Sequence, residues 1–325
     1  MDSVIKVKDV ITPINNYLRS GDGIGQATGY LRYIQLASLR ILEEIDRVCS
    51  IADMDYFLAG GGLLGAARTG GFIPWDDDLD IFMSLSDYDR FISIFNRHNS
   101  IDGLSASLYS APTGVWNMIK VRHKNIPEVS VDVFCYEIMY RSMSIKERLA
   151  FTKQLQTLNV IHSKKRSRYH DVESYHKSFR DLTNENIKDL AFDLDCAEPT
   201  LFFSLGFCHN SIKCNAFRMR DMLPTRKISF ENRLFNAPAD IDVFLTYCFG
   251  DYLRLPIDPS LHVDVENIEL EQALPLLAVC QSIDKCITAS CFNQNKLSHL
   301  PSCLQMAFFN LDSNNNIRLR PSVGS

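Results

Sequence analysis

The stretch from Trp75 to Ile81, WDDDLDI, places four carboxylates among apolar residues. Side chains alternate between the faces of a strand, so Asp78 and Asp80 would share one face while the residues between and after them feed the core. Two such carboxylates lie roughly 7 Å apart, which lets both reach one magnesium ion or two neighbouring ions. Crowded carboxylates repel one another unless a cation is present. The pattern predicts a divalent-metal site at Asp78 and Asp80, supported by Asp76 and Asp77. A solvated acidic loop is the alternative.

A glycine-rich segment, residues 60–65, precedes the acidic stretch. Glycine lets the backbone approach a phosphate closely and leaves its N–H groups available as donors. A helix beginning near Leu63 would point the positive end of its dipole at the same place. Beside a metal-binding strand, Gly61 and Gly62 are therefore candidate phosphate-binding residues. A tight structural turn explains the glycines equally well when they are taken alone.

Hydrophobic periodicity and turn residues predict the elements that must position these groups. The expected elements around the site are a helix over 29–50, a strand over 56–59, a helical turn over 63–68, a strand over 79–83 and a helix over 86–98 with Ser86 as its N-cap. Further along we expect a β-meander over 105–109, 115–121 and 129–134, a largely helical region over 140–205, short strands and turns over 219–256, and one or two helices over 262–310.

The composition is that of a soluble globular protein: 325 residues, 46% of them hydrophobic, with a formal net charge of -5. The acidic balance, with a pI near 5.9, argues against a general nucleic-acid binder. Ten cysteines form no CxxC pair, and the N-terminus resembles no signal peptide, so we expect reduced thiols in the cytoplasm. The sequence holds no apolar run long enough to predict a membrane-spanning helix.

Two groups of residues invite metal or membrane hypotheses that simpler explanations outweigh. Cys208, His209 and Cys214 have irregular spacing and no evident fourth ligand, so buried or free side chains are favoured over a zinc site. The basic stretch 164–168 could contact an anionic membrane surface, although a solvated helix is favoured. The histidines nearby are expected to be solvated; they are His162, His170 and His176.

The residues around the acids resemble the LicD family, which includes bacterial phosphocholine transferases and the fukutin-related transferases. The resemblance is carried by residues 61–68 (GGLLGAAR), 71–81 (GFIPWDDDLDI), 131–134 (VDVF) and a second long block over 223–256. It covers about residues 31–256. The departures are small: Gly62 stands where the family commonly has Thr or Ser, and Cys248-Phe249 replaces a more usual aromatic pair.

The resemblance implies an α+β fold with a polymerase-β-like nucleotidyltransferase core, in which a short mixed sheet is flanked by helices, with added helical regions. It divides the chain into an N-terminal lead-in over 1–28, a catalytic domain over 29–256 with a helical insertion at about 140–205, and a C-terminal helical extension over 257–325.

The resemblance also implies transfer of a phosphorylated alcohol, with phosphocholine favoured, from a CDP-linked donor to a hydroxyl of a cell-surface glycan or lipid-linked glycan. CMP would be released. By position, Asp78 and Asp80 match the metal-binding pair and Asp132 matches the third acidic residue, with Mg²⁺ as the cofactor and Mn²⁺ as the alternative. Asp132 could also accept the proton of the acceptor. We expect a cytoplasmic protein that contacts no nucleic acid and, at most, meets the inner face of the membrane peripherally.

Other residues are candidates for substrate binding, each with a structural alternative of comparable weight. Arg68 could contact phosphate, Trp75 could stack on the cytosine, and Lys120 and Arg122 lie on a predicted strand that could face the donor or the acceptor. Glu231 and Asp251 come from the second block, where they could bind acceptor hydroxyls or satisfy turns; a structural role is slightly favoured.

Three other functions share parts of this pattern. A nucleotidyltransferase that releases pyrophosphate would have the same metal site. A non-catalytic binding protein could keep the fold, although the three intact aspartates speak against it. A DxD glycosyltransferase is disfavoured because the glycine turn precedes the acids on an adjoining strand. The sequence does not specify the alcohol, the acceptor glycan, the oligomeric state or the role of residues 257–325.

Overall fold

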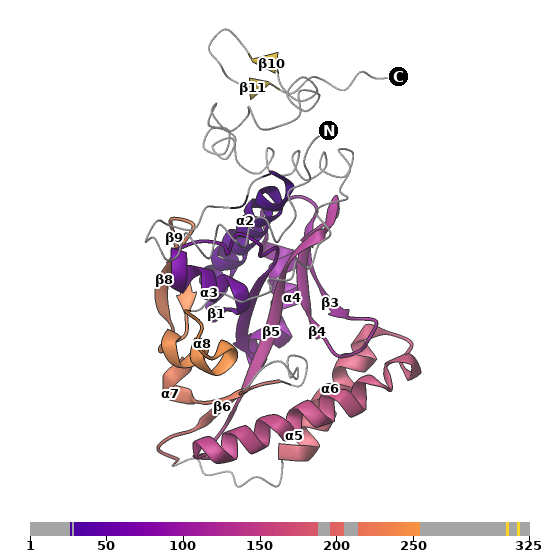
Figure 1. Ribbon diagram of the computed structural model, residues 1–325. Coiled ribbons are helices and arrows are strands. Elements are labelled where there is room, and N and C mark those ends of the chain that lie inside the picture. The colour runs from indigo at the N-terminus through magenta and orange to yellow at the C-terminus, as the bar shows by residue number, and fades with distance from the viewer. Residues whose placement is uncertain are drawn as a thin grey trace, which may run out of the picture.

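The computed structural model describes residues 27, 29–187, 196–204, 214–253, 310–311 and 317–318. Within them, a seven-stranded mixed sheet is flanked by helices (Figure 1). This α+β architecture confirms the fold class expected at that level. The expected N-terminal lead-in lies outside the described residues. So does the expected C-terminal helical extension, except for two short paired strands, β10 (Asn310–Leu311) and β11 (Ile317–Arg318).

The elements around the acids follow the predicted order. They are α2 (Gly29–Ala52), β1 (Tyr56–Ala59), α3 (Gly60–Thr69), β2 (Leu79–Ser84) and α4 (Leu85–His98). The start of one helix differs from the prediction. Helix α3 begins at Gly60 and not near Leu63, so the glycines form its first turn and do not separate it from β1. Strand β2 begins at Leu79, as predicted, so Asp78 directly precedes it.

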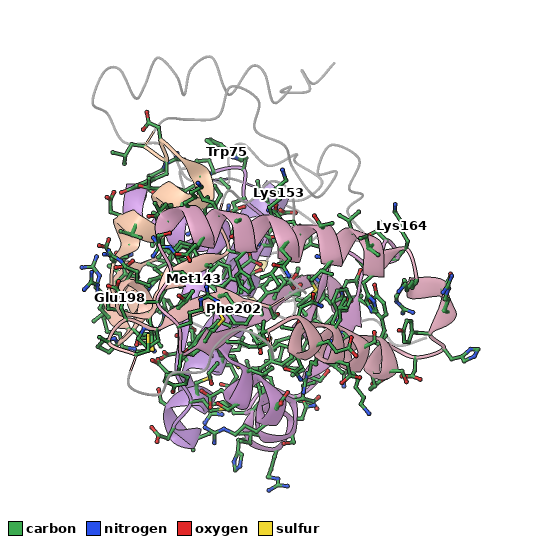
Figure 2. All side chains as sticks on the ribbon, turned by 90° about the horizontal axis from the view of Figure 1, so that it is seen from below. Trp75, Met143, Lys153, Lys164, Glu198 and Phe202 are labelled. Carbon is green, nitrogen blue, oxygen red and sulfur yellow. The ribbon has the colours of Figure 1, made fainter. Side chains whose placement is uncertain are left out.

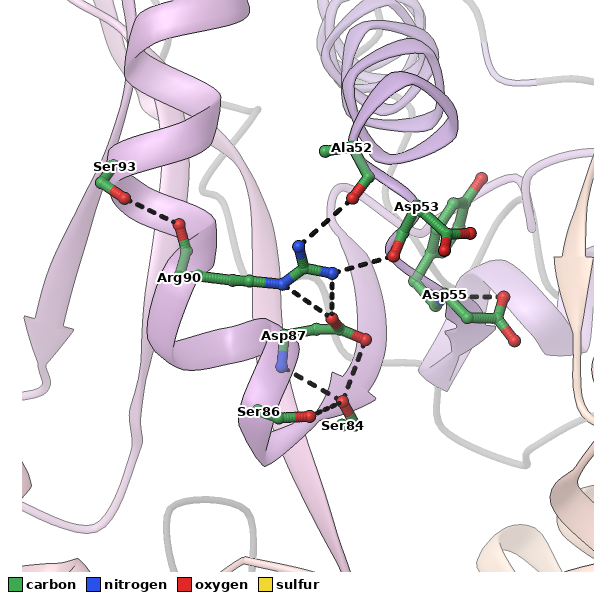
Figure 3. Close-up of polar contacts among 9 residues, drawn as sticks. Ala52, Asp53, Asp55, Ser84, Ser86, Asp87, Arg90 and Ser93 are labelled. Carbon is green, nitrogen blue, oxygen red and sulfur yellow. Dashed lines mark hydrogen bonds and ion pairs between the residues drawn. The ribbon is translucent and has the colours of Figure 1, made fainter.

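Helix α4 is capped by Ser84 and not by Ser86, so that prediction was wrong. The Ser84 hydroxyl accepts a hydrogen bond from the backbone N–H of Asp87 at 3.1 Å (Figure 3). Ser84 is also the last residue of β2 and keeps the extended backbone that an N-cap requires. Arg90, one turn further on, donates to Asp87 and to the backbone carbonyls of Ala52 and Asp53. The start of α4 is thereby fixed to the end of α2.

The sheet has the strand order β1-β2-β5-β4-β3, with β6 and β7 continuing from β5. The predicted meander is present as β3 (Leu104–Ser110), β4 (Asn117–His123) and β5 (Ile126–Met139). Strand β5 is longer than predicted because its two ends pair with different partners, β4 near its start and β6 near its end. Between them β5 pairs in parallel with β2.

Most of the described residues over 140–205 are helical, as predicted, although the region also contributes one strand. It contains α5 (Ile145–Ser163), a short 3-10 turn (Arg166–Arg168) and α6 (Val172–Ile187), but also β6 (Thr200–Phe203), which joins the main sheet. His162 and His176 are buried and not solvated as expected, because α5 and α6 pack on each other and α6 also packs on β3. His176 lies against the backbone carbonyl of Tyr109 at 2.8 Å.

The chain after residue 214 adds both sheet and helix. Its elements are β7 (Ala216–Arg218), α7 (Met219–Met222), the hairpin β8 (Arg226–Phe230) and β9 (Arg233–Ala237), and α8 (Ile241–Phe249). The sequence analysis predicted strands and turns here and missed α8. Most residues of that helix are apolar, so its sequence shows little alternation between apolar and polar faces at the helical period. Phe244 and Leu245 are buried in the core. Its N-cap, Asp240, accepts a hydrogen bond from the N–H of Val243.

One face of the sheet carries a continuous aromatic layer. Phe82 of β2 stacks on Phe57 of β1 and lies 4.0 Å, centroid to centroid, from Phe203 of β6. Phe244 of α8 packs against both Phe57 and Phe203 and covers this layer. Helices α2 and α4 contact each other and β5. None of the described helices is both long enough and apolar enough to cross a membrane.

A candidate metal and phosphate site at the start of strand β2

The strand register brings the two best candidate acids side by side. Asp80 of β2 pairs with Asp132 of β5 in the parallel ladder, and Asp132 pairs in turn with Lys120 of β4. On the other side Asp80 pairs with Ala59, the last residue of β1. Directly paired residues point to the same face of a sheet, so these four residues form one row across four strands. The row lies two residues along the strands from Phe57, Phe82 and Phe134, on the same face.

Burial and neighbouring negative charges disfavour the ionised form of Asp80. Its pKa is raised well above the usual range, first by burial and then by the negative charges of Asp78, Asp132 and Asp76; Lys120 opposes the rise. A carboxyl group in this position gains stability either from a proton or from a cation. A carboxylate whose ionised form is disfavoured in this way is a suitable ligand for a divalent cation.

Asp132 is held by two neighbours. The Lys120 ammonium donates to both carboxylate oxygens at 2.8 Å, and the Ser130 hydroxyl donates to one of them at 2.8 Å. Burial raises the pKa of Asp132, while the ion pair and hydrogen bonds from Lys120 and the Ser130 hydroxyl oppose that rise. Asp132 thus stays oriented beside Asp80, and a raised pKa makes a carboxylate a better proton acceptor.

The residues before β2 form a second acidic group beside Asp80. One carboxylate oxygen from each of Asp76, Asp77 and Asp78 lies within 4.8 Å of the others. The sequence analysis had assigned Asp76 and Asp77 a supporting part only, whereas they stand as close to Asp78 as ligands of one ion would. This loop is anchored by Gln35 of α2, whose amide donates to the Asp76 carbonyl at 2.8 Å. Carboxylate oxygens are the ligands that Mg²⁺ and Mn²⁺ prefer, so the side chains present fit such an ion.

The glycines of α3 lie directly against these carboxylates. A β-carbon on Gly60 would come within 2.2 Å of a carboxylate oxygen of Asp80, and one on Gly61 within 2.0 Å of an oxygen of Asp76. Gly60 also has φ +53°, a conformation that side chains disfavour. Gly62 is closed in by Leu79 of β2. The glycines therefore have a demonstrable packing role, which is to let helix α3 approach the acids.

The same contact places the start of α3 beside the acids. The N-cap residue, Ala59, offers no side-chain hydrogen bond to the helix. The first N–H groups of a helix have no partner within it and carry the positive end of its dipole. A phosphate held near Asp80 would have backbone donors on this side. Gly61 and Gly62 thus stay candidate phosphate neighbours through their backbone.

The second sequence block holds α3 in place. Glu231, in the turn of the β8–β9 hairpin, accepts from the Arg32 guanidinium at 2.6 and 3.1 Å and from the backbone N–H of Phe72 at 3.0 Å. A β-carbon on Gly71 would collide with this carboxylate at 2.6 Å. Its commitment to these partners favours the structural role for Glu231 over contact with an acceptor.

Arg68 and the 250–252 turn meet at the same, C-terminal end of α3. The Arg68 guanidinium donates to the carbonyl of Tyr252, while the Asp251 residue is exposed. Burial lowers the pKa of Arg68. This contact favours a structural role for Arg68, since its guanidinium lies at the C-terminal end of α3 and the glycines lie at the start. Trp75 is half-buried and packs against the hydrophobic core, immediately before the acidic loop.

The structure brings in three residues that the sequence analysis did not select: Ser130, Tyr109 and Arg32. Ser130 precedes Asp132 by two residues on one strand, so strand alternation alone could have identified it. Tyr109 carries Lys120 and Arg122 over its ring, at 5.0 and 5.5 Å from the centroid. Neither Tyr109 nor Arg32 had a recognisable local signal. Of the suspected zinc group, Cys208 and His209 lie outside the described residues.

Comparison with known proteins gives a family match over part of the chain. Residues 53–163 match the family described as LicD/FKTN/FKRP, nucleotidyltransferase domain. This segment therefore carries the LicD-family resemblance that the sequence led us to expect. The match includes the glycines, the acidic loop, Lys120 and Asp132; the second block, over 223–256, lies outside it.

Two kinds of curated relatives share this segment. The chain is 45% identical over 65 residues to the lipopolysaccharide cholinephosphotransferase LicD of Haemophilus influenzae, over 20% of this chain and 24% of that protein. It is 42% identical over 74 residues to the human ribitol 5-phosphate transferase FKRP, over 21% of this chain and 15% of that protein. The mouse FKRP protein matches to the same extent. The matched segment thus spans a quarter or less of each relative.

Proposed function

We propose that this protein transfers a phospho-alcohol from a CDP-linked donor to a hydroxyl of a cell-surface or lipid-linked glycan and releases CMP, with phosphocholine as the favoured group. The observation that carries the proposal is the row of Asp80, Asp132 and Lys120 across the sheet, with the glycine start of α3 packed against Asp80. The relatives named above, a cholinephosphotransferase and ribitol 5-phosphate transferases, support phospho-alcohol transfer as the class of reaction.

In this proposal Asp78, Asp80 and Asp132 would hold Mg²⁺, or Mn²⁺, with Asp76 and Asp77 close enough to join them. The ion would neutralise and orient the pyrophosphate of the donor. The N–H groups at the start of α3 would bind phosphate oxygens opposite the acids. Arg68 and Glu231 would act through α3, whose C-terminal end both of them contact.

Proton removal falls to Asp132 in this scheme. Its carboxylate is oriented by Lys120 and Ser130, and burial raises its pKa toward the range useful for a base. The acceptor oxygen forms a bond to the phosphorus as the bond to the CMP oxygen breaks, and the acceptor proton passes to Asp132. Lys120 would keep Asp132 ionised until then.

The decisive experiment incubates the full chain with Mg²⁺ and a panel of CDP-alcohols in the presence of glycan acceptors, and measures CMP. Release of CMP with one alcohol and not the others supports the proposal and names the group. Release of pyrophosphate from a nucleoside triphosphate, without CMP from any CDP-alcohol, would instead establish the nucleotidyltransferase alternative.

Two variants separate chemistry from folding in that assay. Asp80→Asn should abolish CMP release and lower Mg²⁺ affinity, whereas Asp102→Asn, whose side chain is 99% exposed, should change neither. A non-catalytic binding protein would show no turnover in any variant. Unchanged turnover and metal affinity in Asp80→Asn would refute the metal-centred mechanism.

Peripheral contact with an anionic membrane is a further part of the proposal. Lys153 lies on α5 and Lys164 directly follows it (Figure 2), and Leu149 and Ile161 on this helix are 44% and 52% exposed. Basic side chains interspersed with exposed apolar ones suit an anionic lipid surface. Co-sedimentation with anionic vesicles, lost in Lys153→Gln/Lys164→Gln, would support this contact; equal recovery with zwitterionic vesicles would argue against it.

A further inference from the structure

The half of the sheet beyond Asp132 presents an open polar face. On β3, Leu104 and Ala106 are buried, whereas Ser105 and Ser107 are exposed. Ser107 pairs with Lys120, which itself pairs with Asp132, so the exposed side of β3 is the side that carries the acids. Ser105, Ser107, Tyr109 and Arg122 share this side, and we call them the β3–β4 ledge.

Arg122 is the cation of the ledge, and among the described side chains it has no carboxylate partner. Its guanidinium stacks over the Tyr109 ring, with 5.5 Å between the guanidinium carbon and the ring centroid. It makes no ion pair with any carboxylate in the described part of the chain, whereas the neighbouring Lys120 is bound to both oxygens of Asp132. A stacked, oriented guanidinium offers a planar pair of donors that matches a phosphate or carboxylate.

The position of the ledge assigns it to one of the two substrates. The start of α3, with its backbone donors, lies on the β1 side of Asp80. Asp132, Lys120 and the ledge lie on the opposite side, over β5, β4 and β3. In phosphoryl transfer the attacking and leaving oxygens lie roughly in line, on opposite sides of the phosphorus. A donor held by α3 is therefore attacked from the side of the ledge.

We propose that the β3–β4 ledge is the acceptor subsite, and that Arg122 binds an anionic group, phosphate or carboxylate, on a sugar of the acceptor glycan. Ser105 and Ser107 supply hydroxyls for the neighbouring sugar hydroxyls, and Tyr109 orients Arg122. The row from Asp80 to Ser107 crosses three inter-strand spacings, roughly 14 Å, which suits an extended glycan more than a single small molecule. This assignment rests on the proposed function for the direction of attack.

The test measures binding without donor or turnover. The full chain is titrated by NMR with glucose 6-phosphate, with glucuronate and with uncharged glucose, so that the first two distinguish phosphate from carboxylate. We expect a charged sugar to bind more tightly than glucose. Arg122→Gln should lower the affinity for that charged sugar by about tenfold or more, because a hydrogen-bonded charge pair is lost. Arg122→Lys should restore part of the affinity.

The control variant is Arg97→Gln, an exposed arginine in the last turn of α4, which should titrate as the wild type does. In turnover with a CDP-alcohol, Arg122→Gln should raise the acceptor KM and leave the donor KM unchanged. The assignment is overturned if the wild type binds no charged sugar more tightly than glucose, if Arg122→Gln binds like the wild type, or if only the donor KM rises.

The two proposals fail separately. If charged sugars bind through Arg122 but no CDP-alcohol yields CMP, the ledge stands as an anionic-sugar site and the proposed function fails. If CMP is released and Arg122→Gln leaves sugar binding unchanged, the proposed function stands and the ledge is not the acceptor subsite.

Discussion

Replacing Lys120 by methionine should show how much the unpaired Asp132 carboxylate lowers the stability of the fold. Lys120 donates to both oxygens of Asp132 at 2.8 Å, and the two side chains are 20% and 10% exposed. Removing one partner of a fully buried pair costs about 3–5 kcal/mol, because the other charge is left without compensation. Their partial exposure reduces this, so we expect Lys120→Met to lower the free energy of unfolding by about 2–3 kcal/mol at pH 7.

The loss should depend on pH in a definite direction. Burial raises the pKa of Asp132, and Lys120 opposes the rise, so the variant has a still higher folded pKa. A carboxyl group with a raised folded pKa binds more protons folded than unfolded, so stability falls as pH rises through that pKa. The destabilisation by Lys120→Met should therefore be small near pH 4 and largest at neutral pH.

Urea unfolding at pH 7 and near pH 4 measures this directly, and a second substitution tests its cause. Lys120→Met/Asp132→Asn should recover at least half of the loss, since no unpaired carboxylate remains. Lys124→Met is the matched control, because its ion pair with Asp102 spans 3.5 Å between side chains 61% and 99% exposed. A loss below about 0.5 kcal/mol in Lys120→Met, or no recovery in the double variant, would refute this electrostatic reasoning.

Three further substitutions test other contacts. Burial raises the pKa of Glu137 to about 7, so Glu137→Gln should leave stability unchanged near pH 4 and increase it by up to about 3 kcal/mol above pH 7, measured by urea unfolding across that range; a gain near pH 4 would contradict this. Glu231→Gln should cost about 2–3 kcal/mol by weakening the pair with Arg32, seen as a lower thermal midpoint, and an unchanged midpoint would count against its clamping role. Gly61→Ala should displace the Asp76 carboxylate, cost about 1–3 kcal/mol, and weaken Mg²⁺ binding in calorimetry; wild-type affinity would show that Asp76 does not bear on the ion.

The order of elements could be predicted because it depends on local patterns. The strand–glycine–acid succession from Tyr56 to Asp80 is encoded by short apolar runs and by residues with strong turn preferences. The meander follows from alternation in the same way. The prediction failed where two nearby residues carried similar signals. Ser84 and Ser86 could each have capped α4, and in the structure Ser84 is the N-cap.

Long-range pairing was beyond the sequence. Strand β6 joins β5 after the two helices α5 and α6, and nothing in its short sequence, Thr-Leu-Phe-Phe, distinguishes a strand from a buried helical turn. Helix α8 failed for a related reason, since a helix that is apolar nearly all round shows no period. His162 and His176 were misjudged because the packing of α5 on α6 buries polar residues of a sequence that looks solvated.

In the candidate site, too, local patterns identified some residues, whereas contacts between distant residues could not be predicted. Alternation and crowding were enough to select Asp78 and Asp80, and resemblance added Asp132; their assignment as metal ligands stays a prediction. The parallel pairing of β2 with β5 put Asp80 and Asp132 at equivalent positions, which no local pattern specifies. The partners of Glu231 and Arg68 are also non-local, at Arg32 and Tyr252, so a sequence pattern could mark these residues as notable without revealing their positioning role.

The two clamps on α3 also set when this site can form during synthesis. Every candidate metal ligand has been synthesised once Asp132 is made, but the contacts that fix the C-terminal end of α3 come from Glu231 and from Tyr252, about a hundred residues later. A nascent chain that ends between Asp132 and Glu231 carries all of the acids, but its helix α3 lacks both of these contacts. Since distant contacts form late, ordering of the metal site should wait for the end of α8.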